Sequence, residues 1–247
     1  QVQLTVKNTV GYIEFYNPAH NALPASMLTK LSQLIVKAGS DPSIAVLVIQ
    51  SGGDRTFCAG ASFEELKAIS TPDEGAEFFE GFADVINALR CCPKLTIARV
   101  QGKAVGGAVG IAAATYYCLS SQFASIKLSE LTIGIGPFVV APAIERKIGL
   151  AAFSQLSLDA TTFYSAEWAQ NKGLYSSVYE NNDELDKAVF TLAQNLANYN
   201  PEALTALKQI LWKDTENWDD LLQERAAISG KLVLSPFTKE ALKRFQK

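Results

Sequence analysis

Residues 95–115, LTIARVQGKAVGGAVGIAAAT, combine an apolar run with a glycine-rich turn and an alanine-rich segment. The run LTIARV is typical of a strand covered on both faces, and the four glycines after it let another group come close to the backbone. Their spacing differs from that of the phosphate-binding loop G-x-x-x-x-G-K-[ST] and of the dinucleotide fingerprint G-x-G-x-x-G. Two interpretations remain. The glycines pack a helix closely on a sheet, or free N–H groups at the helix start bind an oxygen on which negative charge develops.

Residues 51–66, SGGDRTFCAGASFEEL, have a similar arrangement upstream. They follow the apolar run IAVLVIQS and again present small residues before a predicted helix. Ser62 is the expected N-cap of that helix, with Glu65 as its capping-box partner. A capped helix start still leaves the N–H of Ala61 free to donate a hydrogen bond.

The order of elements predicts an α/β fold. Two runs, 2–6 and 12–16, form a predicted hairpin, and helical spacing follows at 24–39. Strands and helices then alternate, and the chain reads as wholly helical from Asp183 onward. This pattern predicts an α/β core over residues 1–182 and a C-terminal helical subdomain over residues 183–247, which we expect to mediate oligomerisation.

Composition excludes several classes of function. Lys and Arg total 22 and Asp and Glu total 25, so the net charge of −3 argues against a nucleic-acid-binding surface. The chain has no apolar run of about 20 residues, which predicts no membrane span. The N-terminal residues do not have the pattern of a signal peptide, and the four cysteines show no C-x-x-C spacing. We therefore expect a cytoplasmic protein with reduced thiols.

The single histidine narrows the chemistry further. His20 lies in the turn-rich segment NPAHNALP, where a plain loop residue is expected. Metal sites and Ser-His or Cys-His nucleophiles usually need imidazole, so no metal site is predicted. We expect a carboxyl group to carry any acid–base step.

Five segments in order resemble the enoyl-CoA hydratase/isomerase (crotonase) superfamily. They are FYNPAHNALPASMLTKL (15–31), RTFCAGASFEEL (55–66), VQGKAVGGAVGIAAA (100–114), KLSELTIGIGP (127–137) and SAEWAQNKGLYSSVY (165–179). The resemblance implies a crotonase-like spiral of ββα repeats, assembly into homotrimers or hexamers, and an acyl-CoA thioester as substrate without any other cofactor. The chain as a whole looks most similar to bacterial methylglutaconyl-CoA hydratases, which serve leucine breakdown.

The resemblance also implies the roles of individual residues. Ala61 and Gly107 match the two backbone donors that bind the thioester oxygen, and Glu130 matches a catalytic glutamate. Ser62 stands where the family's A-G-A-D segment has Asp. Lys243, with Arg244, matches basic residues that reach coenzyme A phosphates of a neighbouring subunit. The implied substrate-binding residues are Ala59, Gly60, Ser62, Phe63, Gly106, Phe138 and Lys243, and Phe78, Phe79 and Phe82 are further candidates for the acyl site.

The acid–base count leaves the reaction open. Hydratases of the family usually carry a second glutamate three residues after the glycine donor, but this chain has Gly110 there. A hydratase, a carbon–oxygen lyase, remains the first hypothesis on whole-chain resemblance. One glutamate suits double-bond isomerisation, and a crotonase-like binding protein without catalysis is a third alternative. The apolar neighbours of Glu130 predict a raised pKa for its carboxyl group.

Overall fold

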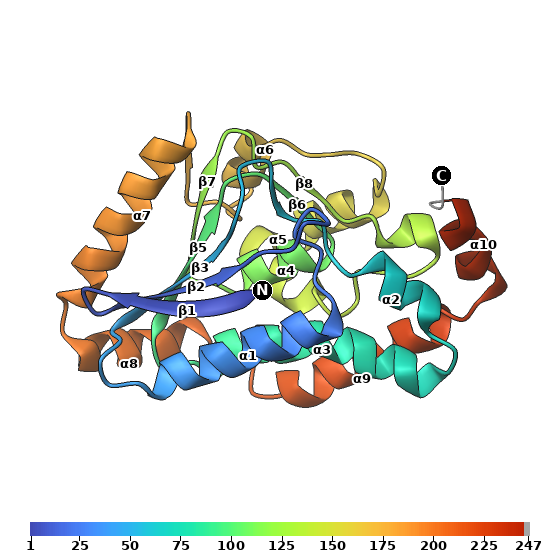
Figure 1. Cartoon of the computed structure of the whole chain (residues 1–247), viewed down its shortest axis with the longest axis horizontal. Helices are drawn as coiled ribbons and strands as arrows, with labels where there is room; N and C mark the ends of the chain where they lie inside the picture. The colour runs from blue at the N-terminus through green and yellow to red at the C-terminus, as the bar shows by residue number, and fades with distance from the viewer. Residues whose placement is uncertain (245–247) are drawn as a thin grey trace.

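A six-stranded sheet forms the centre of the computed structural model, which describes residues 1–244 (Figure 1). Its strands, in spatial order, are β1 (Val2–Lys7), β2 (Val10–Phe15), β3 (Val46–Ser51), β5 (Leu95–Val100), β7 (Tyr117–Ser121) and β9 (Ser177–Tyr179). β1 and β2 form the predicted antiparallel hairpin, and all the other neighbours pair in parallel. The hairpin prediction is thus confirmed.

Three short strands form a second sheet, which is parallel. In sequence, each of them follows a strand of the main sheet and precedes a helix. This sheet consists of β4 (Thr56–Cys58), β6 (Lys103–Val105) and β8 (Ile126–Lys127), in that spatial order. β4 follows β3, β6 follows β5, and β8 follows β7, so the pattern of long strand, short strand and helix repeats three times. This is the predicted spiral of ββα repeats.

The helices complete these repeats. After β4 come α2 (Phe63–Ala68) and α3 (Pro72–Cys91), after β6 comes α4 (Gly107–Ala113), and after β8 come the 3₁₀ turn η1 (Glu130–Ile133) and α5 (Ala141–Leu158). The remaining helices are α1 (Ala25–Ser40), α6 (Ala166–Asn171), α7 (Asn182–Ala197), α8 (Pro201–Leu211), α9 (Trp218–Leu232) and α10 (Pro236–Arg244).

The strand β6 corrects the expectation that the 95–100 strand leads directly into the glycine turn and helix. Gly102 makes the extra strand possible, because a Cβ at this position would lie 2.2 Å from the carbonyl oxygen of Arg55. The chain turns there against the start of β4, and no larger residue fits. Three-residue strands such as β4 and β6 are too short to show a period in the sequence.

The helices bury both faces of the main sheet. α1, α3 and α9 lie together along one side of the molecule, and α7 lies against the sheet elsewhere (Figure 1). α3 and α9 cross closely, since a Cβ on Gly230 would lie 2.3 Å from the amide nitrogen of Ala76. α7 covers the other face through a separate apolar cluster, whose members include Val46, Val48 and Leu185.

The C-terminal part is helical, as predicted from Asp183 onward. Because α7 packs on the sheet and α9 packs on α3, these helices share the core of the preceding residues. The division at residue 182 into a core and a helical subdomain stays a prediction. Residues 245–247, which belong to the predicted subdomain, lie outside the described residues. Within residues 1–244, no helix is both long enough and apolar enough to cross a membrane.

Candidate active site

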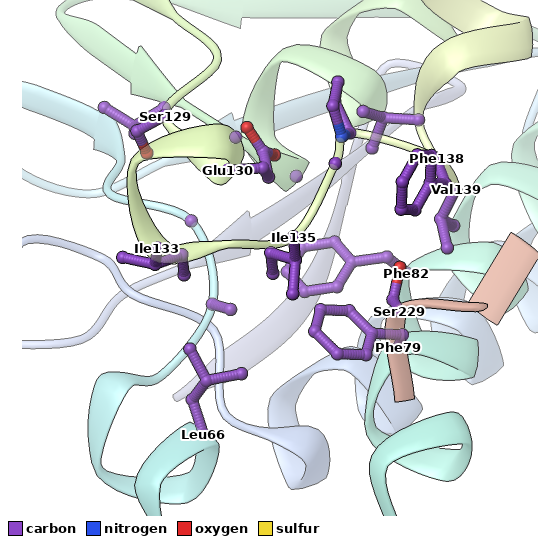
Figure 2. Close-up of a pocket in the computed structure, with 18 of the residues that line it drawn as sticks. Leu66, Phe79, Phe82, Ser129, Glu130, Ile133, Ile135, Phe138, Val139 and Ser229 are labelled. Carbon is purple, nitrogen blue, oxygen red and sulfur yellow. The ribbon is translucent and has the colours of Figure 1, made fainter. Parts of the chain in front are cut away.

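The short parallel sheet positions the site. Because β4, β6 and β8 run in parallel, the segments after them emerge at one edge of the sheet. These segments are 59–61, 106–107 and 129–130, and together they line a cavity of about 80 Å³. Figure 2 shows Glu130 on η1 and the rings of Phe79 and Phe82 on the opposite side of this cavity.

The segment after β4 holds Ala61 between two fixed neighbours. The N–H of Leu23 donates to the carbonyl of Gly60 at 2.8 Å, and the N–H of Ser62 donates to the carbonyl of Leu23 at 3.2 Å. Gly60 has φ of +91°, and a Cβ there would lie 2.9 Å from the carbonyl oxygen of Val105. Within residues 1–244 the N–H of Ala61 donates to no acceptor, so it is free to bind a ligand oxygen.

Ser62 has a structural role beside this segment. Its hydroxyl caps α2 by accepting the N–H of Glu65 at 3.4 Å. The carboxylate of Glu65 accepts the N–H of Ala25 at 2.7 Å and does not return to Ser62, so only half of the expected capping box forms. Ser62 is absent from the residues that line the cavity, whereas its neighbour Phe63 lines it.

The segment after β6 requires glycines, because side chains of neighbouring elements lie against its backbone. A Cβ on Gly106 would lie 2.9 Å from Oε1 of Glu130, and a Cβ on Gly107 would lie 2.1 Å from the ring of Phe82. Gly106 also has φ of +57°. Gly107 begins α4, and its N–H donates to no acceptor in the part of the chain that the structure describes. Close packing at the glycines is therefore confirmed, but their neighbours are Glu130, Phe82 and Val140 and not the sheet that the sequence led us to expect. The N–H of Gly107 is free within the described residues, and its binding of an oxygen stays a prediction.

Glu130 is the first residue of η1, and its carboxyl group is buried against Gly106. Its Oε2 atom is inaccessible and has no hydrogen-bond partner among residues 1–244. Burial raises the pKa of Glu130 to about 7, as the apolar neighbours predict. Near neutral pH the group is thus present in both the protonated and the ionised form, which suits a residue that accepts and returns a proton.

The position three residues after Gly107 has no room for a second carboxyl group. A Cβ on Gly110 would lie 2.4 Å from Cγ1 of Val140 and 2.6 Å from its Cβ. Val140 itself lines the cavity. The side chain of Val140 therefore occupies the space into which a residue at position 110 would extend.

The rest of the cavity wall is mainly apolar. Phe79 and Phe82 line it as expected, but Phe78 is buried elsewhere in the core. Among the described residues, Glu130 is the only charged side chain in the lining, and Ser129 and Ser229 are the only hydroxyl groups. The further lining residues that sequence reasoning missed are Leu66, Val105, Ser129, Ile133, Ile135, Gly136, Pro137, Val139, Val140 and Ser229.

Lys243 does not reach this cavity within one chain. It lines a separate groove of about 440 Å³ between α2 and α10, together with Lys67 and Lys239. Leu66 borders both the cavity and this groove, which we call the basic groove. Lys67 and Arg90 are the two residues that the sequence offers as partners for a second carboxylate of the substrate. Lys67 lies in the basic groove, and Arg90 lies elsewhere and pairs with Asp219 at 2.9 Å.

Known proteins resemble this chain in sequence and in fold. Residues 5–246 match the family described as Enoyl-CoA hydratase/isomerase. The chain is 29% identical over 234 residues to the peroxisomal Delta(3,5)-Delta(2,4)-dienoyl-CoA isomerase of Arabidopsis thaliana, covering 87% of this chain and 82% of the relative. It is 31% identical over 199 residues to the 2,3-dehydroadipyl-CoA hydratase of Escherichia coli (strain K12), covering 80% and 76%. A crystal structure of an enoyl-CoA hydratase from Bacillus halodurans superposes with a TM-score of 0.90 at 22% identity, covering 98% and 99%.

Proposed function

The chain belongs to the enoyl-CoA hydratase/isomerase family, and from this premise we propose that it moves the double bond of a short-chain enoyl-CoA. One observation carries the choice of reaction. Glu130 is the only acid–base side chain in the described cavity lining, and Val140 fills the space beside Gly110. Isomerisation needs one group that removes a proton at one carbon and returns it at another.

The proposed mechanism uses the three segments at the sheet edge. The N–H groups of Ala61 and Gly107 bind the thioester oxygen of a 3-enoyl-CoA. Glu130 removes a proton from the α carbon, and the electron pair moves into a dienolate whose negative charge rests on that oxygen. Glu130 then returns the proton to the γ carbon, which leaves the conjugated 2-enoyl-CoA. Loss of one such donor typically costs ~10²–10³ in rate.

The two adjacent cavities support a coenzyme A thioester as the ligand. The apolar cavity suits a short, neutral acyl chain, and the lysines of the basic groove, which borders this cavity in the same chain, suit the phosphates of the same coenzyme A molecule. This assignment replaces the contact with a neighbouring subunit's coenzyme A that the family resemblance implies. No cofactor beyond the substrate enters this mechanism. A 3-methylglutaconyl chain carries a second carboxylate, and among residues 1–244 no Lys, Arg or His lines the cavity to balance it. We therefore expect a neutral four-carbon chain, such as that of 3-butenoyl-CoA, to react faster than a chain that carries a second carboxylate.

Hydration is the second candidate, because a hydratase is among the similar proteins at 31% identity. In this reaction Glu130 takes a proton from water as the water oxygen bonds to the β carbon, and the resulting enolate then receives the proton at its α carbon. The unpartnered Oε2 of Glu130 argues against the third alternative, a binding protein without catalysis, since a buried carboxyl group kept without a partner costs stability. We further propose a homotrimer or hexamer in the cytoplasm, in line with the family resemblance.

Ultraviolet absorbance of the conjugated enoyl thioester separates the two reactions. An isomerase raises the absorbance when it receives 3-butenoyl-CoA and leaves crotonyl-CoA largely unchanged. A hydratase lowers the absorbance of crotonyl-CoA and yields a hydroxyacyl product by mass spectrometry. In D₂O, a single buried base that carries the proton between two carbons gives less than one deuterium per product. Absence of turnover with every substrate, despite tight binding, would overturn both reactions.

A further inference from the structure

Helix α10 contacts both the basic groove and the turn that carries Glu130. One part of it contributes Lys239 and Lys243 to the groove. Its first residues lie against η1, and Figure 1 shows α10 at the same end of the molecule as α2. The two sites that the proposed function assigns to one ligand are thus bridged by a single nine-residue helix.

The contact with η1 is made at Gly134, the residue that ends the turn. Gly134 has φ of +82°, and its N–H donates to the carbonyls of Glu130 and Leu131. A Cβ there would lie 2.5 Å from Cδ1 of Phe237 and 2.7 Å from Oγ1 of Thr238. Because η1 is one 3₁₀ turn, its own hydrogen bonds do little to fix its position, and contacts with neighbouring elements decide where Glu130 lies.

The start of α10 is fixed to the end of α9 on its other side. Thr238 is fully buried, its hydroxyl donates to the carbonyl of Leu232 at 3.1 Å, and its N–H donates to Oγ of Ser235 at 3.2 Å. Phe237 in contrast is 65% exposed, and one edge of its ring lies against Gly134, the residue that follows η1. Phe237 can therefore be changed with little effect on the core, while Thr238 cannot.

We propose that Phe237 is a positioning residue through which an anion bound by Lys239 and Lys243 orders η1 and so places Glu130. The inference rests on the proposed function only for the identity of the anion, the nucleotide phosphates of coenzyme A. Binding energy from a non-reacting part of the substrate then supports the chemical step, so it raises kcat as well as lowering KM.

Hydrogen exchange tests the coupling without any turnover. Adenosine 3′,5′-bisphosphate, which carries phosphates but no acyl chain, should slow amide exchange in residues 130–135 of the wild type by about tenfold. In Phe237→Ala the probe should still bind, measured by calorimetry, but should leave that exchange unchanged. Phe237→Leu should restore part of the effect. Lys239→Ala with Lys243→Ala should abolish binding, and Lys30→Ala on the exposed face of α1 should not.

The ratio of kcat for an acyl-CoA to kcat for an acyl-pantetheine gives a second test. This ratio would not change if Phe237 had only a structural role. Wild-type kcat should be about tenfold higher for an acyl-CoA than for the same acyl group on pantetheine, and Phe237→Ala should remove this difference with KM for the CoA ester largely kept. Equal loss of kcat on both thioesters would overturn the coupling while leaving the proposed reaction intact. Unchanged exchange in the wild type with the probe bound would overturn it as well. A protein that shows the exchange effect but no turnover would contradict the proposed function alone.

Discussion

Two walls of the cavity differ in whether they carry a carboxyl group that can exchange a proton. The wall after β8 places the carboxyl group of Glu130 in a buried position with an unpartnered oxygen. The wall between α4 and α5 has no side chain at Gly110, and Val140 closes the space. One wall therefore keeps a costly ionisable group, and the other uses the corresponding place for packing.

A second buried ionisable group shows why the first wall is unusual. Lys208 is also buried, but its Nζ donates to the carbonyls of Leu89 and Lys94, each at 3.0 Å. Its charge is matched by acceptors, as is typical of a structural residue. In the part of the chain that the structure describes, Oε2 of Glu130 has no hydrogen-bond partner, which is typical of a group kept for chemistry.

Replacing Glu130 should give the largest effect. Glu130→Gln keeps the shape of the side chain but cannot exchange a proton, so kcat should fall on the order of 10³-fold while binding of the CoA ester survives. Stopped-flow absorbance and calorimetry measure the two quantities. The exposed Glu145 on α5 offers a matched control, and Glu145→Gln should keep activity. Activity of Glu130→Gln within threefold of wild type would remove Glu130 from the mechanism.

The same variant should change how stability depends on pH. The pKa of Glu130 is about 7 in the folded chain and near 4.5 in the unfolded chain, so the folded state holds the proton more tightly. The stability that this proton brings is fully present below about pH 4.5 and is lost as pH rises through 7, about 3 kcal/mol in all.

Glu130→Gln cannot lose this proton, and its stability should not fall over that range. Its melting temperature should rise relative to wild type by several degrees between pH 5 and pH 8. Calorimetric melts of both proteins across this range make the comparison. Parallel melting curves would show that Glu130 is not desolvated in the folded state.

The two walls also differ in how far the sequence predicts them. Glu130 lies in a segment that carries the family resemblance, and its apolar neighbours predict the direction of its pKa. The sequence also shows Gly110 at the position where the family resemblance leads us to expect a second glutamate. The contact with Val140 is not visible, because it depends on how α5 returns onto α4 some 30 residues later. Ser229 reaches the cavity only through the close crossing of α3 and α9 at Gly75 and Gly230, which no local pattern predicts.

Rebuilding the closed wall gives the smallest expected effect and the sharpest comparison. Gly110→Glu alone should lower stability by roughly 2 kcal/mol, because its side chain overlaps with Val140. Combining it with Val140→Gly removes the obstructing methyl groups and should recover much of that loss in thermal melts. The double variant then has two carboxyl groups in one cavity, which raises the pKa of Glu130 further and supplies a second group to hold water.

The ratio of hydration to isomerisation should therefore rise in the double variant, measured with crotonyl-CoA and 3-butenoyl-CoA in parallel. Val140→Gly alone is the control, since it opens the wall without adding a carboxyl group and should not raise hydration. If Gly110→Glu alone is as stable as wild type, Val140 moves aside at little cost, and packing does not exclude the second carboxyl group. If the double variant is stable but its reaction ratio is unchanged, the count of carboxyl groups does not decide the reaction, and the difference between the two walls is one of packing only.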